Sequence, residues 1–370
     1  MHVRLVDPSA YTPPYDHALA SALARGGDRV TLMTSDFPYG RVPPPEGYVI
    51  ERAFYRRAVG PAGSRLRRAA KVAQHVPDMR RLARTARDAD VVHFQWLAVQ
   101  HVDVRLLPRD RPVVLTAHDV LPREARRGQR DAQRRLYERV DATVVHSAHG
   151  RRRLVEDLGI DPARVHLIPH GAFRHLTTLE PALLPAPLDR VKRPVVLFFG
   201  LLRPYKGVDV LLEAWRRLAG DGEPAAELWI VGLPKMDVSA MRRTAPAGVR
   251  FVDRFVADEE AAAFFARADA VVLPYREIDQ SGVLFTALAF GKPTVLSAVG
   301  GFPEIAREGA AELVPPGDAP ALADALGRLL GDRPRREALA ARAAELAAGP
   351  YSWDAIAAAH RAVYRGLLDG

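Results

Sequence analysis

Short apolar runs typical of strands alternate with longer segments of helical periodicity in two successive series along this chain. The first series contains the runs HVRLV, RVTLMTS, VVHFQW, PVVLTAH, ATVVHS and VHLIPHG, and the second contains PVVLFFG, ELWIVG, VRFVD, AVVLPY and PTVLS. Strands that alternate with helices form parallel sheets covered by helices on both faces. The sequence therefore predicts an α/β fold with two doubly wound, Rossmann-like domains.

A proline-rich segment with little periodicity separates the two series, and we take it as the domain boundary. We expect an N-terminal domain over residues 1–172, a linker over 173–193 and a C-terminal domain over 194–352. The length of 370 residues is roughly twice that of a typical domain. This length agrees with two domains that face each other across a cleft.

Composition excludes several classes of protein. The apolar share of 48% and the charged share of 26% are ordinary for a soluble globular protein. The chain has no cysteine, which rules out disulfides, thiolate catalysis and zinc sites built from cysteine. No apolar run approaches the ~18 residues of a membrane-spanning helix, and the first residues resemble a strand rather than a signal peptide. We therefore expect a cytosolic enzyme.

Positive charge is concentrated in the N-terminal half. The chain has 53 basic and 44 acidic residues, a net charge of +9. Residues 51–90 hold eleven basic and four acidic side chains, and residues 121–153 hold ten and four. Such a balance admits nucleic acid, an anionic membrane or a phosphorylated substrate as partner. No recognition helix, zinc finger or aromatic platform is evident, so we expect no nucleic-acid partner.

One basic segment leaves a membrane contact open. A helix over about 64–87 would carry Leu66, Val72 and Val76 on its apolar side among many arginines. Such a helix could rest on the inner face of an anionic membrane, where a lipid-linked substrate would be found. The alternative is a solvated helix in an arginine-rich sequence. Asp88 and Asp90, which follow this helix, have a spacing that can bind a metal, but Asp is also common where a helix ends before a strand.

The loop after the run PVVLFFG has the features of a phosphate site. Gly200 turns the chain, Arg203 and Lys206 follow, and Gly207 precedes a helix. Two cations beside a helix N-terminus suit a phosphate or diphosphate, because the helix dipole and the side chains act on the same anion. The alternative is an ordinary strand-to-helix loop with solvated cations.

A second segment, Val271 to Glu304, strengthens this interpretation. It combines a strand, a polar loop and a helix that opens at Ser281, Gly282 and Val283. The amides of Gly282 and Val283, with the Ser281 hydroxyl, would form an anion-binding nest. Because ligands bind beyond the carboxyl ends of parallel strands, we expect both loops to form one diphosphate pocket.

The second half of the chain resembles the family 4 glycosyltransferases of the GT-B fold. Their pattern is Gly-Arg-(x)4-Lys-Gly, then Glu-(x)7-Glu running into Ala-x-Ala-x-Gly-x-Pro. The matching positions are Gly200, Lys206, Gly207, Ala287, Ala289, Gly291 and Pro293. The chain departs from the pattern at Leu201, where Arg203 stands two residues later, and at Ile278 and Thr286, which replace the two glutamates. The C-terminal stretch of about 353–370 resembles the crossover helix with which this fold returns to its first domain.

The resemblance implies a set of donor-binding and catalytic residues. Glu277 or Asp279 would supply the missing carboxylate near the sugar, and Thr286 would meet the ribose only as a neutral group. Together with His118, which family members place at the end of a strand facing the sugar, the catalytic candidates are His118, Arg203, Lys206, Glu277 and Asp279. The donor-binding candidates are Gly200, Arg203, Lys206, Gln280, Ser281, Gly282, Val283, Thr286 and Glu304.

The acceptor side departs further from the family. Where many relatives have a Gly-Gly loop, this chain has Tyr11 to His17 with Pro13 and Pro14, and a stiff Pro-Pro loop offers no equivalent amide nest. Asp16 and His17 are our candidates for contacting an acceptor hydroxyl, or else for capping the following helix. Trp96 either stacks on a sugar ring or packs in the core.

The resemblance implies a retaining glycosyltransferase of the hexosyltransferase type. It would move a sugar from a nucleoside diphosphate sugar to a hydroxyl acceptor such as a glycan, a lipid-linked glycan or a small natural product. A UDP-sugar is favoured as donor and a GDP-sugar stays open. We expect neither a cofactor nor a metal ion, because two cations and a helix dipole can stabilise the leaving diphosphate. The alternatives are a sugar-nucleotide epimerase of the same fold and a non-catalytic nucleotide-sugar binder.

Overall fold

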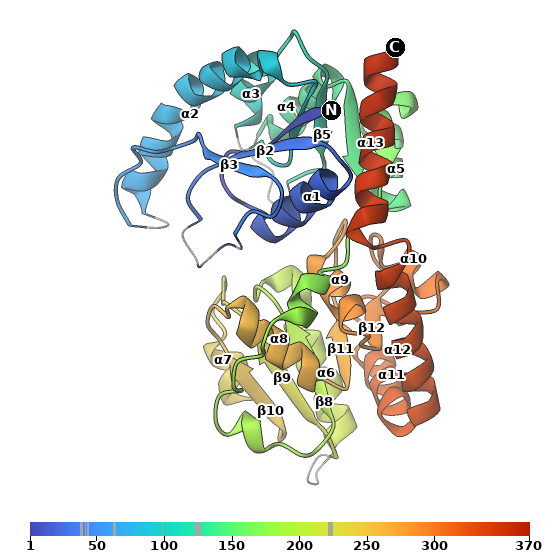
Figure 1. Cartoon of the computed structure of the whole chain (residues 1–370). Coiled ribbons are helices and arrows are strands. Elements are labelled where there is room, and N and C mark those ends of the chain that lie inside the picture. The colour runs from blue at the N-terminus through green and yellow to red at the C-terminus, as the bar shows by residue number, and fades with distance from the viewer. Residues whose placement is uncertain are drawn as a thin grey trace. The chain divides into compact units, whose positions relative to one another are not determined.

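The computed structural model of this chain describes residues 1–37, 40, 42, 44–61, 64–97, 99–122, 127–220 and 225–370. The chain divides into two compact units (Figure 1). The first unit comprises Met1–Pro169 and Trp353–Gly370, and the second comprises His170–Ser352. Each unit has its own parallel sheet with helices around it, so the α/β, doubly wound fold predicted from the sequence is confirmed.

The first unit is built on a seven-stranded parallel sheet of order β3-β2-β1-β4-β5-β6-β7. The strands are β1 (His2–Asp7), β2 (Arg29–Thr34), β3 (Val49–Arg52), β4 (Val91–Phe94), β5 (Val113–Thr116), β6 (Ala142–Val145) and β7 (Val165–Leu167). The strand order reverses between β1 and β4, and doubly wound sheets bind their ligands beyond the strand ends at such a point. The edge strand β3 is not predicted by the sequence; it is short and mostly exposed.

Among the described residues, α-helices from the N-terminal stretch and one from the C-terminus belong to this unit. They are α1 (Pro13–Arg25), α2 (Arg65–Thr85), α3 (Gln100–Leu106), α4 (Gln129–Arg139), α5 (Ala148–Arg152) and α13 (Trp353–Asp369). Helix α13 packs on α1, where the Trp353 and Tyr15 rings are 5.0 Å apart and Arg25 pairs with Asp354 at 2.7 Å (Figure 1). The helical pattern of the sequence predicts that α4 starts near Glu124, a position outside the described residues.

The prediction of a stiff loop at Pro13 and Pro14 is wrong. Both prolines lie in the first turn of α1, which begins at Pro13. A proline at the start of a helix is favourable, because its missing N–H would have no partner there and its fixed φ already suits the helix. The two prolines therefore start the helix instead of stiffening a loop.

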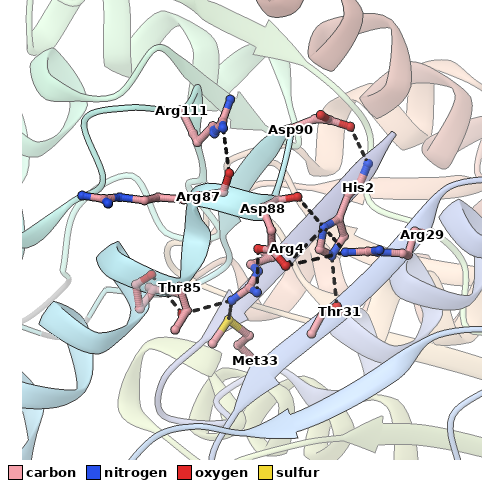
Figure 2. A network of polar contacts seen from close by, with 11 residues as sticks. His2, Arg4, Arg29, Thr31, Met33, Thr85, Arg87, Asp88, Asp90 and Arg111 are labelled. Atoms are coloured by element: carbon pink, nitrogen blue, oxygen red, sulfur yellow. Dashed lines mark hydrogen bonds and ion pairs between the residues drawn. The ribbon is translucent and has the colours of Figure 1, made fainter.

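Asp88 and Asp90 take part in a polar network at the amino ends of β1, β2 and β4 (Figure 2). Asp88 pairs with Arg4 at 2.8 Å and with Arg29 at 3.6 Å, and Asp90 accepts a hydrogen bond from the His2 amide at 2.7 Å. This edge of the sheet is opposite to the carboxyl edge, where ligands bind. The Asp-x-Asp pair thus joins the segment between α2 and β4 to the first two strands.

The second unit has a six-stranded parallel sheet of order β10-β9-β8-β11-β12-β13. Its strands are β8 (Val195–Phe199), β9 (Glu227–Val231), β10 (Val249–Val252), β11 (Ala270–Leu273), β12 (Thr294–Ser297) and β13 (Ala311–Val314). Its helices are α6 (Val208–Ala219), α7 (Ser239–Arg243), α8 (Asp258–Arg267), α9 (Gly282–Ala289), α10 (Phe302–Arg307), α11 (Ala319–Gly331) and α12 (Arg333–Ala348). Here the strand order reverses between β8 and β11.

Residues 173–193 are not a linker, which corrects the domain boundary predicted from the sequence. They belong to the second unit, which begins at His170. Leu188 lies in the core of that unit, and the Ala182 amide donates to the Glu259 carbonyl at 3.1 Å. The segment contains two short 3-10 helices, Arg174–Thr178 and Leu188–Arg190, and apolar residues such as Leu188 fix it to the unit. Among the described residues, no helix has the length and apolar character needed to cross a membrane.

Candidate functional site

The loops after β8 and β11 meet at the point where the second sheet reverses its strand order. Gly207 and Gly200 have left-handed φ values of +68° and +115°. A Cβ on Gly207 would lie 2.1 Å from the Pro274 carbonyl oxygen, so only glycine allows the two loops to approach this closely. The predicted phosphate loop and the predicted polar loop are therefore brought together within this unit.

Lys206 is a buried cation held by an aromatic side chain. Its Nζ donates to the Tyr275 hydroxyl at 3.1 Å and lies 4.8 Å from the centre of the same ring. A Cβ on Gly200 would lie 3.0 Å from this Nζ, which places the ammonium directly beside the turn that ends β8. Cation–π contact and hydrogen bond together fix the charge at the carboxyl edge of the sheet.

Arg276 fastens the turn that carries Lys206. Its guanidinium binds both carboxylate oxygens of Asp209 at 2.8 and 2.6 Å and also donates to the Pro204 carbonyl at 3.0 Å. Its backbone amide donates to the Tyr205 carbonyl at 2.7 Å. The hydrogen bonds from Arg276 lower the pKa of Asp209, as expected for a bidentate pair. Arg276 was not singled out from the sequence.

Arg203 differs from Arg276. Arg203 directly precedes the turn Pro204–Lys206 and is half-buried. Within the described ranges, the Arg203 guanidinium makes no ion pair or hydrogen bond. An arginine in this state can pair with an anionic ligand without first breaking an internal contact.

The N-terminus of α9 faces the turn at Gly200. Val283 Cγ2 would be 3.3 Å from a Cβ on Gly200. Ser281 is the N-cap residue, and its side chain does not cap the helix. In the part of the chain that the structure describes, the amides of Gly282 and Val283 donate to no protein acceptor. These two helical amides and the Lys206 ammonium lie near Gly200, where the sequence predicts a site for an anion.

The two carboxylate candidates have different surroundings. The Asp279 side chain is 6% exposed, whereas Glu277 lies in solvent. The turn before α10 packs on Asp279, whose carbonyl accepts from the Gly301 amide at 3.1 Å. A Cβ on Gly300 would lie 1.8 Å from the Ile278 carbonyl oxygen, so any side chain at position 300 would collide with the loop that carries Asp279. This packing of the two loops brings Glu304, in the first turn of α10, to the same edge of the sheet as Asp279.

Thr286 and Gln280 use their side chains locally. The Thr286 hydroxyl donates to the Gly282 carbonyl at 3.0 Å, so toward a ligand its oxygen can act only as an acceptor. Gln280 accepts from the Ser281 amide through its side-chain oxygen at 3.0 Å. Both residues shape the start of α9.

His170 and Phe173 also belong to this edge, although they were not predicted from the sequence. A Cβ on Gly282 would lie 3.3 Å from Phe173 Cε2 and 3.8 Å from His170 Nε2. The His170 ring stacks on Phe285 of α9, with 4.7 Å between ring centres. The only sequence signal for them is their place at the end of the run VHLIPHG, which contains His170 and which Phe173 follows by two residues.

In the first unit, His118 follows β5, is partly buried and is flanked by aromatic side chains. Trp96 stacks on it with 5.3 Å between ring centres and 13° between planes, and Tyr15 meets it edge-on at 4.7 Å. Its two ring nitrogens lie near Gln95 and His146. Trp96 itself is half-buried, and its indole N–H donates to the Thr12 hydroxyl at 3.1 Å. One face of Trp96 is thus used for packing on His118.

Asp16 and His17 lie in the first turn of α1 and do not cap that helix, whose N-cap residue is Thr12. They line a small cavity of about 40 Å³, large enough for water but not for a sugar. Burial, with the neighbouring Asp7 carboxylate, raises the pKa of Asp16 well above its usual range. His17 is hydrogen-bonded to the Tyr48 hydroxyl.

Comparisons with known proteins agree with the resemblance seen in the sequence. Residues 193–332 match the family profile "Glycosyl transferases group 1", and residues 15–172 match "Glycosyltransferase Family 4". A D-inositol 3-phosphate glycosyltransferase of Nocardia farcinica is 33% identical over 308 residues, which cover 76% of this chain and 65% of the relative. The corresponding enzyme of Corynebacterium aurimucosum is 30% identical over 316 residues, with 76% and 72% covered. The aligned stretch thus spans less than two thirds of the Nocardia relative.

Solved structures show the same fold. HepE of Anabaena, determined in complex with UDP-glucose, superposes with a TM-score of 0.73 at 18% identity, covering 99% of this chain and 100% of that one. This likeness supports the GT-B architecture of two Rossmann-like domains.

Proposed function

Because this chain belongs to the family 4 glycosyltransferases, we propose that it transfers a sugar from a nucleoside diphosphate sugar to a hydroxyl acceptor with retention of configuration. The observation that carries the proposal is the group of donors at one sheet edge: the Lys206 ammonium, the Arg203 guanidinium and the free amides of Gly282 and Val283. A diphosphate is the ligand that such a group suits. A UDP-sugar is the favoured donor, since HepE binds UDP-glucose.

These donors would act on the leaving group. The bond from sugar C1 to the diphosphate oxygen breaks with its electron pair on the diphosphate, and the acceptor oxygen takes its place at C1 with loss of its proton. Negative charge grows on the diphosphate, where fixed cations and amides stabilise it. Lys206 is suited to this task because Tyr275 holds it in place before the donor arrives.

The other candidates fit the sugar and the nucleoside. Asp279 and Glu304, at adjoining turns, would accept hydrogen bonds from sugar hydroxyls, and the exposed Glu277 is the weaker candidate. Thr286 would accept from a ribose hydroxyl. His118, in the other unit, would hydrogen-bond a sugar hydroxyl or the developing charge. Trp96 stays a candidate for the acceptor side, whereas the cavity beside Asp16 and His17 has room for water and not for a sugar.

We propose that the reaction needs no metal ion, because the two cations and the helix N-terminus supply positive charge to the diphosphate. Transfer should then continue in excess EDTA at an unchanged rate. Loss of activity on chelation, restored by a divalent cation, would contradict this.

The acceptor unit also suits contact with an anionic membrane. The exposed face of α2 carries Arg65, Arg68, Arg80, Arg81 and Arg84. Between them stand Leu66 and Val72, which are 61% and 62% exposed. The one acidic residue of α2, Asp78, is buried and pairs with Arg81 at 3.1 Å. A face of cations and exposed apolar side chains without acids is typical of helices that lie on anionic lipid.

Vesicle flotation tests this contact. We expect the protein to float with phosphatidylglycerol vesicles and not with phosphatidylcholine vesicles, and the double variant Arg65→Glu/Arg68→Glu to stay behind. The pair Arg242→Glu/Arg243→Glu, on α7 of the other unit, is the matched control. Equal behaviour of all proteins on both lipids would contradict a membrane role for α2.

One experiment tests the proposed function and separates its alternatives. The protein is screened for thermal stabilisation by nucleoside diphosphates and their sugars, and the donor found is then incubated with acceptors. D-inositol 3-phosphate heads the acceptor panel because the curated relatives are named for it. We expect release of the nucleoside diphosphate together with a glycosylated product. A sugar isomer formed without acceptor would indicate an epimerase, and binding without transfer or hydrolysis would indicate a non-catalytic binder.

A further inference from the structure

Two buried polar side chains, Gln95 and His146, and the partly buried His118 form a chain of contacts along the carboxyl edge of the first sheet. Gln95, His118 and His146 follow the neighbouring strands β4, β5 and β6. His118 Nε2 lies 3.3 Å from Gln95 Oε1, and His118 Nδ1 lies 3.2 Å from His146 Nε2. His146 Nδ1 lies 3.0 Å from the carbonyl oxygen of Ile168, just after β7. The chain thus runs across four adjacent strands and includes the proposed sugar-binding histidine.

The hydrogen bond between His146 and Ile168 determines which ring nitrogens of the two histidines carry a proton. A carbonyl oxygen only accepts, so His146 must donate to Ile168 through Nδ1–H. Burial lowers the pKa of His146 to about 4, so the ring carries a single proton at neutral pH. Its Nε2 is then an acceptor. The His118 nitrogen that faces it, Nδ1, must therefore carry a proton.

On the other side of the ring, His118 Nε2 faces the side-chain amide of Gln95, which is fully buried. Its side-chain amide lies between two imidazoles, because Gln95 Nε2 is also 3.3 Å from His93 Nε2. The two ends of an amide are assigned from their hydrogen-bond partners, and either end can face His118. Toward a neutral His118 that is protonated on Nδ1, the NH₂ end is the complementary one.

His93 anchors this amide from the other side. Its two nitrogens lie 2.7 Å from the Thr116 hydroxyl and 2.6 Å from the Tyr364 hydroxyl of α13. Trp96 and Tyr15 hold the plane of the His118 ring, as described above. The partly exposed His118 ring is thus contacted by Trp96, Tyr15, Gln95 and His146.

On the basis of the proposed function, we propose that His146 and Gln95 are positioning residues that fix His118 as the Nδ1–H tautomer. Neutral His118 then presents the lone pair of Nε2, which accepts a hydrogen bond from a donor hydroxyl of the sugar in place of the long contact to Gln95. The opposite tautomer would direct a proton there and would suit an acceptor atom. The network therefore determines which kind of substrate atom His118 recognises.

Nitrogen NMR of histidine-labelled protein measures the tautomer directly. The His118→Gln variant assigns the His118 signals in the wild-type spectrum. At pH 7.5 we expect a protonated Nδ1 and an unprotonated Nε2. In His146→Leu, which lacks the acceptor, we expect a mixture of both tautomers. In His146→Gln, whose side-chain oxygen reaches about as far as Nε2, we expect the wild-type tautomer.

Kinetics with UDP-glucose as the donor probe give a second readout. We expect His146→Leu to lower kcat for UDP release about tenfold, with the donor KM changed less than about twofold, because one orienting hydrogen bond is lost. His146→Gln should recover most of kcat. His101→Leu, an exposed histidine on α3, is the matched control and should behave as wild type.

The inference is overturned if wild-type His118 carries its proton on Nε2, or if His146→Leu keeps both the tautomer and kcat. If His146→Leu does not fold, the wild-type spectrum and the His146→Gln variant still show whether His118 is held as the Nδ1–H tautomer. If the wild-type protein transfers no sugar from any donor, the proposed function fails, while the tautomer measurement still accepts or rejects the positioning network.

Discussion

The Lys206 ammonium lies 3.1 Å from the hydroxyl oxygen of Tyr275 and 4.8 Å from the centre of its ring. Tyr275 follows β11 and Lys206 precedes α6, so this contact joins the two loops at the reversal point of the second sheet. Tyr275 is itself fully buried and packs on Phe302 of α10. The cation is therefore oriented by the core of its own domain, independently of any ligand.

Removing the Tyr275 hydroxyl tests this orientation. We expect Tyr275→Phe to weaken donor binding about tenfold, because a hydrogen bond to a charged group contributes roughly 1.5–3 kcal/mol. Tyr275→Leu, which also removes the ring, should weaken it further. Calorimetric titration with UDP measures both effects. Equal affinity in the wild type and both variants would show that Tyr275 does not position Lys206.

The pair of Arg276 and Asp209 should matter more for donor binding than for stability. Both side chains are partly exposed, at 41% and 52%, so the free energy of unfolding should fall by no more than about 1 kcal/mol in Arg276→Ala. The loosened turn should raise the Kd for UDP about fivefold. Arg254→Ala removes a comparable pair with Glu260 elsewhere in the unit and serves as the control. Parallel losses in the two variants would argue against a positioning role.

Gly207 is expected to tolerate no side chain. In Gly207→Ala the left-handed φ costs about 1–2 kcal/mol, and the collision of Cβ with the Pro274 carbonyl oxygen adds to it. Gly317 also has a left-handed φ, of +77°, but among the described residues nothing lies within 4 Å of its Cβ position. Urea unfolding should therefore show a clearly larger loss for Gly207→Ala than for Gly317→Ala. Equal losses would mean that the loops can separate freely.

The sequence predicts the parallel sheets well because alternating strands and helices leave few other folds. It fails where local patterns are ambiguous. Pro13 and Pro14 resemble a loop although prolines also start helices, and the edge strand β3 is too short and too exposed to stand out. Residues 173–193 resemble a linker because three prolines interrupt any periodic pattern there, although apolar residues such as Leu188 bind the segment to the core.

Some residues of the candidate site could be predicted from the sequence, and others could not. Lys206, Arg203 and the Ser281 to Val283 segment directly follow strands or open helices, so their chemistry can be read locally. Tyr275, Arg276 and His146 act through residues on other elements. Their roles depend on which loops meet in space, and sequence spacing carries no record of that.

Acid should destabilise the first unit through a buried histidine. Burial lowers the pKa of His360 from 6.5 to about 4, and its Nε2 has no hydrogen-bond partner among the described residues. Between these two pKa values the unfolded chain binds more protons, so the free energy of unfolding falls as the pH drops from 6.5 to 4. Above pH 6.5 this histidine contributes no pH dependence.

Replacing His360 isolates this contribution. Over that pH range, His360→Leu should lose less stability than the wild type, by roughly 3 kcal/mol at most. Urea unfolding at pH 7 and pH 4.5 measures the difference, with exposed His101→Leu as control. An unchanged pH dependence in His360→Leu would contradict a neutral, buried His360.

The most direct test of the account is the rate of sugar transfer by Lys206→Ala. Loss of a fixed cation at the leaving diphosphate should raise the barrier by about 3 kcal/mol and lower kcat roughly a hundredfold. Lys192→Ala, an exposed lysine of the same unit, should keep the wild-type rate. Near-normal transfer by folded Lys206→Ala would contradict the assignment of this buried cation to the leaving group.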